Sequence, residues 1–262
     1  MTPVAVRRLS VAWPWRYLAR QLLWAGLDLI FPPRCGGCGQ AGERFCAACL
    51  ASLQHLGAPL CERCGYPLAA AERAAGRCAA CRRQSGSALM GIRSVAFFEG
   101  PLQQALHRLK YKRDMILADS LARVLHDAWQ AYALPGDVVV PVPLSAERLR
   151  ERGYNQAGLL ARGFADLSGR SCAPAGLARR RHTSSQVGLS RAERHENVAG
   201  AFAGQAKAVA GRSVILVDDV CTTGATLEAG AEALRAAGAA RVWGFTLARA
   251  RFDQPAAGHG EP

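Results

Sequence analysis

The stretch VILVDDVCTTGAT, residues 214–226, decides how the rest of the chain is interpreted. Four apolar residues run into two adjacent aspartates, Asp218 and Asp219, and then into a loop of small hydroxylated residues and glycine. This order predicts a buried strand that ends at the carboxylates, followed by a loop that turns into a helix. Carboxylates accept hydrogen bonds from a polyol, and the N–H groups at a helix N-terminus hold phosphate. The stretch therefore predicts a site for a pentose 5-phosphate, whereas simple helix capping would account for only one of the acids.

The segments around this stretch predict an α/β fold. Alternating strands and helices are expected for a mainly parallel sheet covered by helices on both faces. In such sheets ligands bind at the carboxyl ends of the strands, which is where Asp218 and Asp219 fall. The expected strands are 92–98, 137–144, 214–217 and 241–248, and the expected helices are 101–111, 115–133, 145–167 and 224–237.

The cysteines predict two structural zinc sites in front of this domain. In a chain without an export signal, paired C-x-x-C spacing favours zinc over disulfides, because two such pairs place four thiolates around one ion. Sequential pairing of the motifs fits the spacing better than cross-braced pairing, although both remain open. Zinc should supply the folding free energy of so small a segment. The predicted ligands are Cys35, Cys38, Cys46, Cys49, Cys61, Cys64, Cys78 and Cys81.

The charge and composition of the chain limit the classes of binding partner that we expect. The 262 residues are half apolar and carry a net charge of +13, almost wholly from arginine. Because the guanidinium group suits phosphate, nucleotides, phosphorylated sugars and nucleic acid become the favoured partners, with a merely solvated basic surface as the alternative.

The N-terminal region predicts no membrane span and no signal peptide. Charged residues such as Arg16, Arg20 and Asp28 interrupt the apolar runs before they reach the roughly 18 residues that a spanning helix needs. A helix over 16–30 would pack on its own domain or lie on an anionic membrane surface. We therefore expect a cytoplasmic protein, with contact at the inner face of the membrane left open.

The changes in composition predict four parts. These are an amphipathic lead-in (1–33), a double zinc ribbon (34–88), the α/β domain (89–250) and a disordered tail (251–262).

Residues 214–226 closely resemble the phosphoribosyl-pyrophosphate signature of type I phosphoribosyltransferases, with Cys221 where that signature usually has an aliphatic residue. The resemblance implies that Asp218 and Asp219 are catalytic and contact the ribose hydroxyls. It also implies that magnesium bridges the pyrophosphate and ribose oxygens. The implied 5-phosphate loop is Thr222, Thr223, Gly224, Ala225 and Thr226, and the implied pyrophosphate loop is Val142, Pro143 and Leu144.

A wider resemblance covers nearly the whole chain from Phe31 to Arg249. Four cysteine pairs are followed in order by LKY, VPVPLSAERLRERGYNQA, RRRHTSSQVGLSRAERHENVAGAF and LVDDVCTTGATL. This order resembles the ComF (ComFC) competence family, in which a zinc-binding segment precedes a phosphoribosyltransferase domain. The resemblance implies a role in natural transformation, with single-stranded DNA and competence-machinery proteins as candidate partners.

Four arginines are candidate ligands of the pyrophosphate. Arg148 and Arg152 stand a turn apart on a helix beyond the pyrophosphate loop and could reach the same anion. Arg191 and Arg194 belong to a stretch whose position matches the hood that closes over the active site of phosphoribosyltransferases and excludes water. Solvated surface residues are the alternative for both pairs.

Two functional hypotheses follow. In one, a nitrogen nucleophile displaces pyrophosphate from C1 of the phosphorylated ribose, with no acceptor and no general base readable from the sequence. In the other, the domain is a binding module without turnover that grips single-stranded DNA through its zinc segments and arginines. Few aromatic residues lie between the basic ones, which weakens the prediction of a stacking platform for single strands.

Overall fold

The computed structural model describes residues 32–84, 86–180 and 200–251. The helix expected over 16–30, the tail from 252 onward, and the arginine-rich residues 181–199, which include Arg191 and Arg194, lie outside the described residues. Across the described ranges, no helix combines the length and the apolar character that crossing a membrane requires.

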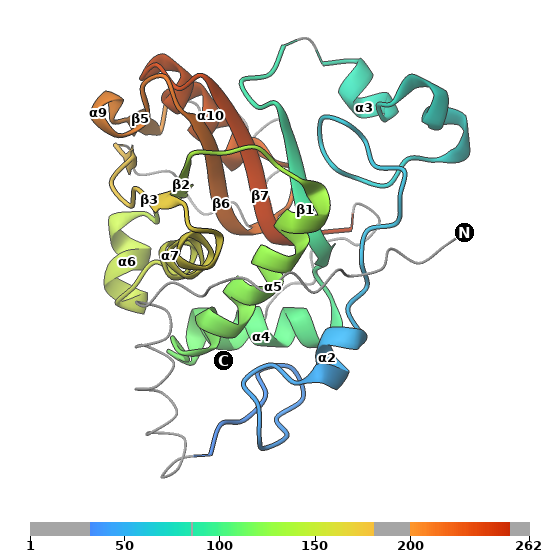
Figure 1. The fold of residues 1–262 in the computed structure, drawn as a ribbon, viewed down its shortest axis with the longest axis vertical. Coiled ribbons are helices and arrows are strands. Elements are labelled where there is room, and N and C mark those ends of the chain that lie inside the picture. The colour runs from blue at the N-terminus through green and yellow to red at the C-terminus, as the bar shows by residue number, and fades with distance from the viewer. Residues whose placement is uncertain (1–31, 85, 181–199, 252–262) are drawn as a thin grey trace.

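A parallel sheet of five strands forms the centre of the described structure, in the order β1-β7-β6-β2-β3 (Figure 1). Every pairing within this sheet is parallel, which confirms the predicted fold class. The carboxyl ends of neighbouring strands therefore meet at one edge, where the two aspartates were expected. The strands are β1 (Gly91–Phe97), β2 (Val138–Pro141), β3 (Ser171–Cys172), β6 (Ser213–Cys221) and β7 (Arg241–Arg249).

Helices cover both faces of the sheet because the side chains of each central strand alternate between two apolar cores. On β6, Ile215 and Val217 pack with α4, α5 and α7, whereas Val214 and Leu216 pack with α10 and a two-stranded antiparallel sheet of β4 and β5. All four side chains are fully buried. The bounds are α4 (Gly100–Tyr111), α5 (Leu117–Tyr132), α7 (Gln156–Ser168), α10 (Ala225–Ala236), β4 (Leu177–Arg179) and β5 (Phe202–Gly204), with a short α9 (Ala206–Val209) between β5 and β6.

The helix predicted over 145–167 is interrupted, so its predicted extent was wrong. Gly153, with φ of 79°, ends α6 (Ala146–Arg152) in the left-handed conformation that glycine adopts at little cost. Ser145 caps α6 by accepting from the Arg148 N–H at 3.3 Å, and Asn155 caps α7 by accepting from the Ala157 N–H at 3.1 Å.

Strand β6 is longer than the four apolar residues predicted. Its pairing with β7 continues past them, with Asp218 opposite Thr246 and Cys221 opposite Arg249. Because β7 extends as far, it supplies backbone partners beyond the apolar run. Both aspartates therefore belong to the strand itself.

Two cysteine-rich segments pack against the sheet domain at separate places (Figure 1). The first, with α2 (Ala47–Ala51), lies against α4, where Arg108 Nη1 donates to the Cys35 carbonyl at 3.1 Å. The second, with the 3-10 helix η1 (Ala70–Ala75) and α3 (Ala79–Arg82), lies against β1, where the Ile92 N–H donates to the Arg63 carbonyl at 2.7 Å.

Candidate functional site

The acid pair lies where the carboxyl ends of β2 and β6 meet. The Val142 N–H, just after β2, donates to the Val217 carbonyl at 2.9 Å, immediately before Asp218. On its other side, Asn155 Nδ2 donates to the Val142 carbonyl at 3.0 Å. The loop 142–144 is thus fixed beside the two aspartates, although a long stretch of sequence separates them.

Lys110 forms an ion pair with Asp219. Its Nζ, in the last turn of α4, lies 2.5 Å from Asp219 Oδ2, and the two side chains are only 17% and 6% exposed. Burial raises the pKa of Asp219, but the nearby positive charges of Lys110 and Arg152 outweigh it and hold that pKa below its usual value. Asp219 is therefore a carboxylate at neutral pH.

Asp218 has the opposite electrostatic environment. Burial and the negative charge of Asp219 raise the pKa of Asp218 well above its usual value, although the Asp219 N–H donates to Asp218 Oδ1 at 2.9 Å. The positive charge of Lys110 lowers the pKa of Asp218 in part, and the charge of Arg179 on β4 also interacts with Asp218. One carboxyl of the pair is thus ionised while its neighbour readily holds a proton.

This difference predicts how Asp218→Asn changes stability with pH. A raised pKa means that the folded protein binds the Asp218 proton more tightly than the unfolded chain does. The wild type therefore loses stability relative to Asp218→Asn as the pH rises from about 4, the unfolded pKa, up to the raised folded pKa. Urea unfolding of both proteins at pH 5, 6, 7 and 8 measures this change. If the free energies of unfolding of the two proteins differed by the same amount at every pH, the raised pKa of Asp218 would be contradicted.

Residues 222–224 connect β6 to α10 in a tight turn, and Ala225 and Thr226 begin the helix. Gly224 caps α10 with φ of 88°, a left-handed conformation that favours glycine, and a Cβ there would lie 2.9 Å from Ile92 Cδ1 and displace the end of that side chain. Thr223 Oγ1 accepts from the Ala225 N–H at 3.3 Å. The turn aims the positive end of the α10 dipole at the edge of the sheet, an arrangement that suits a phosphate.

The two predicted arginines of α6 act on different charged groups near the acid pair. Arg152 donates to Gln156 Oε1 at 3.0 Å, and its charge acts on Asp219. Arg148 is exposed, and its charge acts on Arg179. The other predicted pyrophosphate ligands, Arg191 and Arg194, lie outside the described residues.

The sequence-based site missed Lys110 and the contribution of Arg179. Two signals pointed to Lys110: it is the centre of LKY, and it is one of only three lysines in a chain whose positive charge is mostly arginine. Arg179 begins the arginine-rich stretch, but nothing local distinguishes it from its neighbours.

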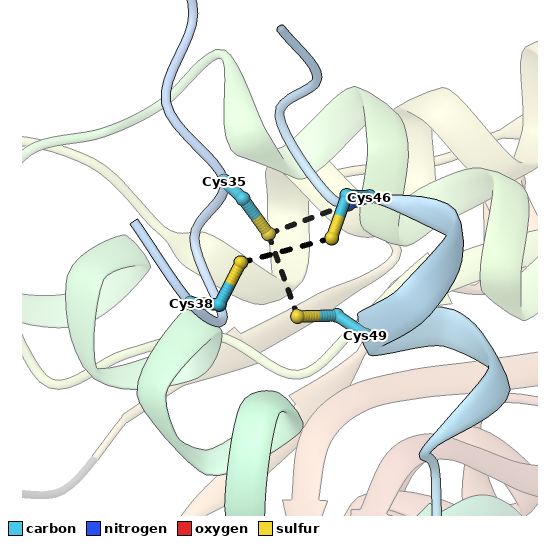
Figure 2. Close-up of side chains that lie close together, drawn as sticks. All are labelled: Cys35, Cys38, Cys46 and Cys49. Carbon is cyan, nitrogen blue, oxygen red and sulfur yellow. Dashed lines mark hydrogen bonds between the residues drawn. The ribbon is translucent and has the colours of Figure 1, made fainter. Parts of the chain in front are cut away.

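The first cysteine segment forms a four-sulfur site (Figure 2). Sγ of Cys35 lies 3.6 Å from Sγ of Cys49, and Sγ of Cys38 lies 3.7 Å from Sγ of Cys46. Zinc with Zn–S bonds of about 2.3 Å in a tetrahedron separates its ligands by roughly 3.8 Å, whereas a disulfide needs about 2.05 Å. The backbone N–H groups of Cys46 and Gly37 also donate to Cys35 Sγ, which stabilises a thiolate.

The second segment repeats this arrangement. Cys64 Sγ and Cys78 Sγ are 3.8 Å apart, and the Cys78 N–H donates to Cys61 Sγ at 3.4 Å. In each segment the four ligand atoms lie within 4.8 Å of one another. The sequential grouping is confirmed: the first zinc site is Cys35, Cys38, Cys46 and Cys49, and the second is Cys61, Cys64, Cys78 and Cys81.

Removal of zinc should open these segments while leaving the sheet intact. Native mass spectrometry should find two zinc ions per chain, and a strong chelator or acid should release them because protons compete for the thiolates. Limited proteolysis should then cleave within 34–83 and spare β6 and β7, whose apolar cores do not depend on the metal. An unchanged cleavage pattern after verified zinc loss would contradict this expectation.

The sheet, the acid pair with its loop, and the two four-cysteine sites define a phosphoribosyltransferase-domain protein with an N-terminal double zinc ribbon. The sequence matches the phosphoribosyl transferase domain family over residues 116–256 and the double zinc ribbon domain family over residues 26–82.

The chain belongs to the ComF competence family. It is 32% identical to Competence protein F of Haemophilus influenzae, over 80% of this chain and 92% of that protein. It is 33% identical to DNA utilization protein YhgH of Salmonella typhimurium, over 78% and 90% of the two chains. Competence protein ComFC of Bacillus subtilis is 29% identical, over 88% and 91%.

Proposed function

We propose that this protein binds phosphoribosyl pyrophosphate together with magnesium, and that it is a phosphoribosyltransferase. The observation that carries the proposal is the adjacent pair Asp218 and Asp219 at the end of β6, followed directly by the Gly224 turn into α10. The carboxylates would accept the ribose hydroxyls, and the turn would hold the 5-phosphate. The loop 142–144 would approach the pyrophosphate.

The basic residues around the pair suit the charge that such a transfer develops. The bond between C1 and the pyrophosphate oxygen breaks as a nitrogen nucleophile attacks, so the sugar becomes positive and the leaving group negative. Arg148 and Arg152, joined in the proposal by Arg191 and Arg194, would neutralise the pyrophosphate. Magnesium, when bound, would supply further neutralisation. Asp219, held ionised by Lys110, would stabilise the positive sugar.

The names of the relatives support a cellular role. Similar proteins are called competence proteins and DNA utilization proteins, so we infer that this protein acts in competence and DNA uptake. Proteins of the uptake machinery are its proposed partners.

Calorimetric titration of the zinc-loaded protein with phosphoribosyl pyrophosphate, with and without magnesium, tests the binding proposal. We expect saturable binding at one site per chain that requires magnesium. Acceptor bases would then be screened for pyrophosphate release. A folded, zinc-loaded protein that shows no heat of binding would overturn the proposal.

A second function, binding of single-stranded DNA, is supported by side chains that the fold brings together. The rings of Phe98 and His107 stack with centroids 6.2 Å apart, and those of His107 and Tyr111 are 5.6 Å apart. The Arg152 guanidinium lies 5.3 Å from the Tyr111 ring, and Tyr111 is 63% exposed. We call Phe98, His107 and Tyr111 the aromatic strip. Aromatic rings beside cations bind single strands with little sequence preference.

The strip adjoins other features that suit an extended ligand. Lys110, which lies over the Phe98 ring at one end of the strip, contacts Asp219. His107, the middle ring, lines an open groove of about 530 Å³ between α4 and the first zinc site. A single strand of DNA bound here would run from the groove to the acid pair.

Tyr111→Ala should therefore weaken binding of a fluorescent oligothymidylate by about tenfold, since stacking of one base contributes ~1–3 kcal/mol. Fluorescence anisotropy at fixed salt measures the change. Leu149→Ala, which removes an apolar side chain of α6 that is 44% exposed, serves as the control. Equal affinities of the wild type and Tyr111→Ala would remove the strip from the DNA-binding surface.

A further inference from the structure

Cys221, where the signature departs from an aliphatic residue, has a specific partner in this chain. Arg249 Nη1, at the end of β7, donates to Cys221 Sγ at 2.7 Å, and both side chains are buried. The neighbouring Ala250 N–H donates to the Cys221 carbonyl at 2.9 Å. Cys221, the last residue of β6 before the phosphate loop, is therefore held by both its side chain and its backbone.

The same arginine reaches the second zinc site. Its guanidinium lies 5.9 Å from the ring centroid of Tyr66, which also packs edge-on against Phe97 at 6.0 Å. The Tyr66 carbonyl accepts from the Cys61 N–H at 2.8 Å, inside the second zinc knuckle. Arg249 thus lies between the knuckle and the start of the phosphate loop.

The middle of the loop contacts the same segment through Ile92. The Ile92 N–H donates to the Arg63 carbonyl, and Gly65 packs so closely on the Ile92 carbonyl that no Cβ would fit. The Ile92 side chain in turn fills the space over Gly224. A narrow crevice lined by Cys64, Cys81, Thr223 and Gly224 marks this contact.

The helix that follows the loop is tied down just beyond the second zinc site. Ser87 Oγ donates to Glu228 Oε2 at 2.7 Å, and the Ala88 N–H donates to Glu228 Oε1 at 2.6 Å. Glu228 belongs to the first turn of α10. By contrast, the first zinc site contacts α4 and α5, through Arg108 and Leu117, and none of its described contacts reaches the loop.

We propose that the second zinc site positions the phosphate loop, with Arg249 as the positioning residue, so that zinc at this site, and not at the first, sets the affinity for the phosphorylated ligand. The physical reason is that a zinc knuckle folds only around its metal. When the knuckle unfolds, Tyr66 and Gly65 no longer pack against Arg249 and Ile92. These two residues then no longer hold the phosphate loop in position. The part of the proposal that concerns affinity rests on the proposed binding of phosphoribosyl pyrophosphate.

The chain offers a closely matched test, because each zinc site ends in the same tetrapeptide, CAAC. One variant carries Cys78→Ser and Cys81→Ser, and the other carries Cys46→Ser and Cys49→Ser. Each should retain one zinc ion per chain. In the first variant, amides 222–226 should exchange with deuterium about tenfold faster and the affinity should fall about tenfold; in the second, both should stay within about twofold of the wild type. Equal effects in the two variants would overturn the proposal.

A second set of variants keeps both zinc ions. Arg249→Met should retain two zinc ions, and its amides 222–226 should gain more in exchange rate than the amides of the sheet core do, because the Cys221 contact is lost. Arg249→Lys, which keeps a cationic donor, should recover part of the protection. Arg251→Met is the control, because Arg251 lies two residues beyond Arg249 but donates to Glu99. It should change neither the zinc content nor the exchange of amides 222–226. If amides 222–226 of Arg249→Met exchanged with deuterium at the wild-type rate, Arg249 would have no positioning role.

The exchange measurement uses no ligand, so it separates the two proposals. If the wild type binds no phosphoribosyl pyrophosphate, the proposed function fails, and the exchange comparison still decides whether the second zinc site holds the loop.

Discussion

The double variant Asp218→Asn, Asp219→Asn is expected to lose at least ~100-fold in affinity for phosphoribosyl pyrophosphate. Hydrogen bonds to charged groups contribute about 1.5–3 kcal/mol each, and the variant removes the charge from both acceptors while keeping their shape. The turn at Gly224 is unchanged, so the 5-phosphate would keep its contacts and some weak binding would remain. Calorimetric titration in the presence of magnesium measures the loss.

The matched control is Asp127→Asn on α5, whose side chain is 64% exposed and whose Oδ1 lies 3.5 Å from His126 Nδ1. It should bind like the wild type, because a solvated surface charge contributes little. Wild-type affinity in the Asp218→Asn, Asp219→Asn protein would show that phosphoribosyl pyrophosphate binds at another site.

Lys110→Met is expected to reduce the free energy of unfolding at pH 8 by about 3 kcal/mol, because removing one partner of a buried ion pair leaves the other charge unpaired. It should also weaken ligand binding, since Asp219 would then take up a proton more readily. In the wild type, burial raises the pKa of Asp219 and the charge of Lys110 more than reverses that effect. The pair therefore stabilises the protein above the ordinary pKa of an aspartate, about 4, and that contribution is lost only as the pH falls through the lowered pKa of folded Asp219. In Lys110→Met, burial acts on Asp219 without the opposing charge of Lys110, so Asp219 takes up a proton at a higher pH. The difference between the two proteins should therefore already shrink as the pH falls from 8 toward 4.

Chemical unfolding of the wild type and Lys110→Met at pH 8 and pH 4 measures this difference. Lys112→Met is the control, because Lys112 is exposed two residues further along the chain. Adding Asp219→Asn to Lys110→Met should restore most of the lost stability, since the unpaired charge is gone. If Lys110→Met unfolded like the wild type at pH 8, the ion pair would have no energetic role.

The acid pair shows why the site needs more than its two carboxylates. Two buried like charges cannot both ionise cheaply, so the protein holds Asp219 ionised with Lys110 and leaves Asp218 prone to protonation. A ligand that brings hydroxyl donors and a divalent cation would favour the ionised form of both.

The features that the sequence by itself determined are those encoded in neighbouring residues. The alternation of apolar strands and amphipathic helices predicted the parallel sheet, because burial on both faces requires that pattern. The four C-x-x-C motifs predicted both zinc sites and favoured their sequential grouping, because the ligands of each site come from one short segment; the structure then decided the grouping. The acid pair and the glycine turn were also predicted, because they lie on one strand, one loop and one helix that follow each other directly in the sequence. The limits of β6 and the break at Gly153 were not, because pairing with β7 and the local caps decide where the elements end.

Only the tertiary structure decided which distant side chains meet. Lys110 reaches Asp219, and Phe98, His107 and Tyr111 line up beside it, because α4 packs next to the end of β6. Arg249 meets Cys221 because β7 lies beside β6 in the sheet, whereas its contact with Tyr66 depends on where the second zinc segment docks. A sequence carries no local signal for such contacts, since the packing of whole elements fixes their geometry.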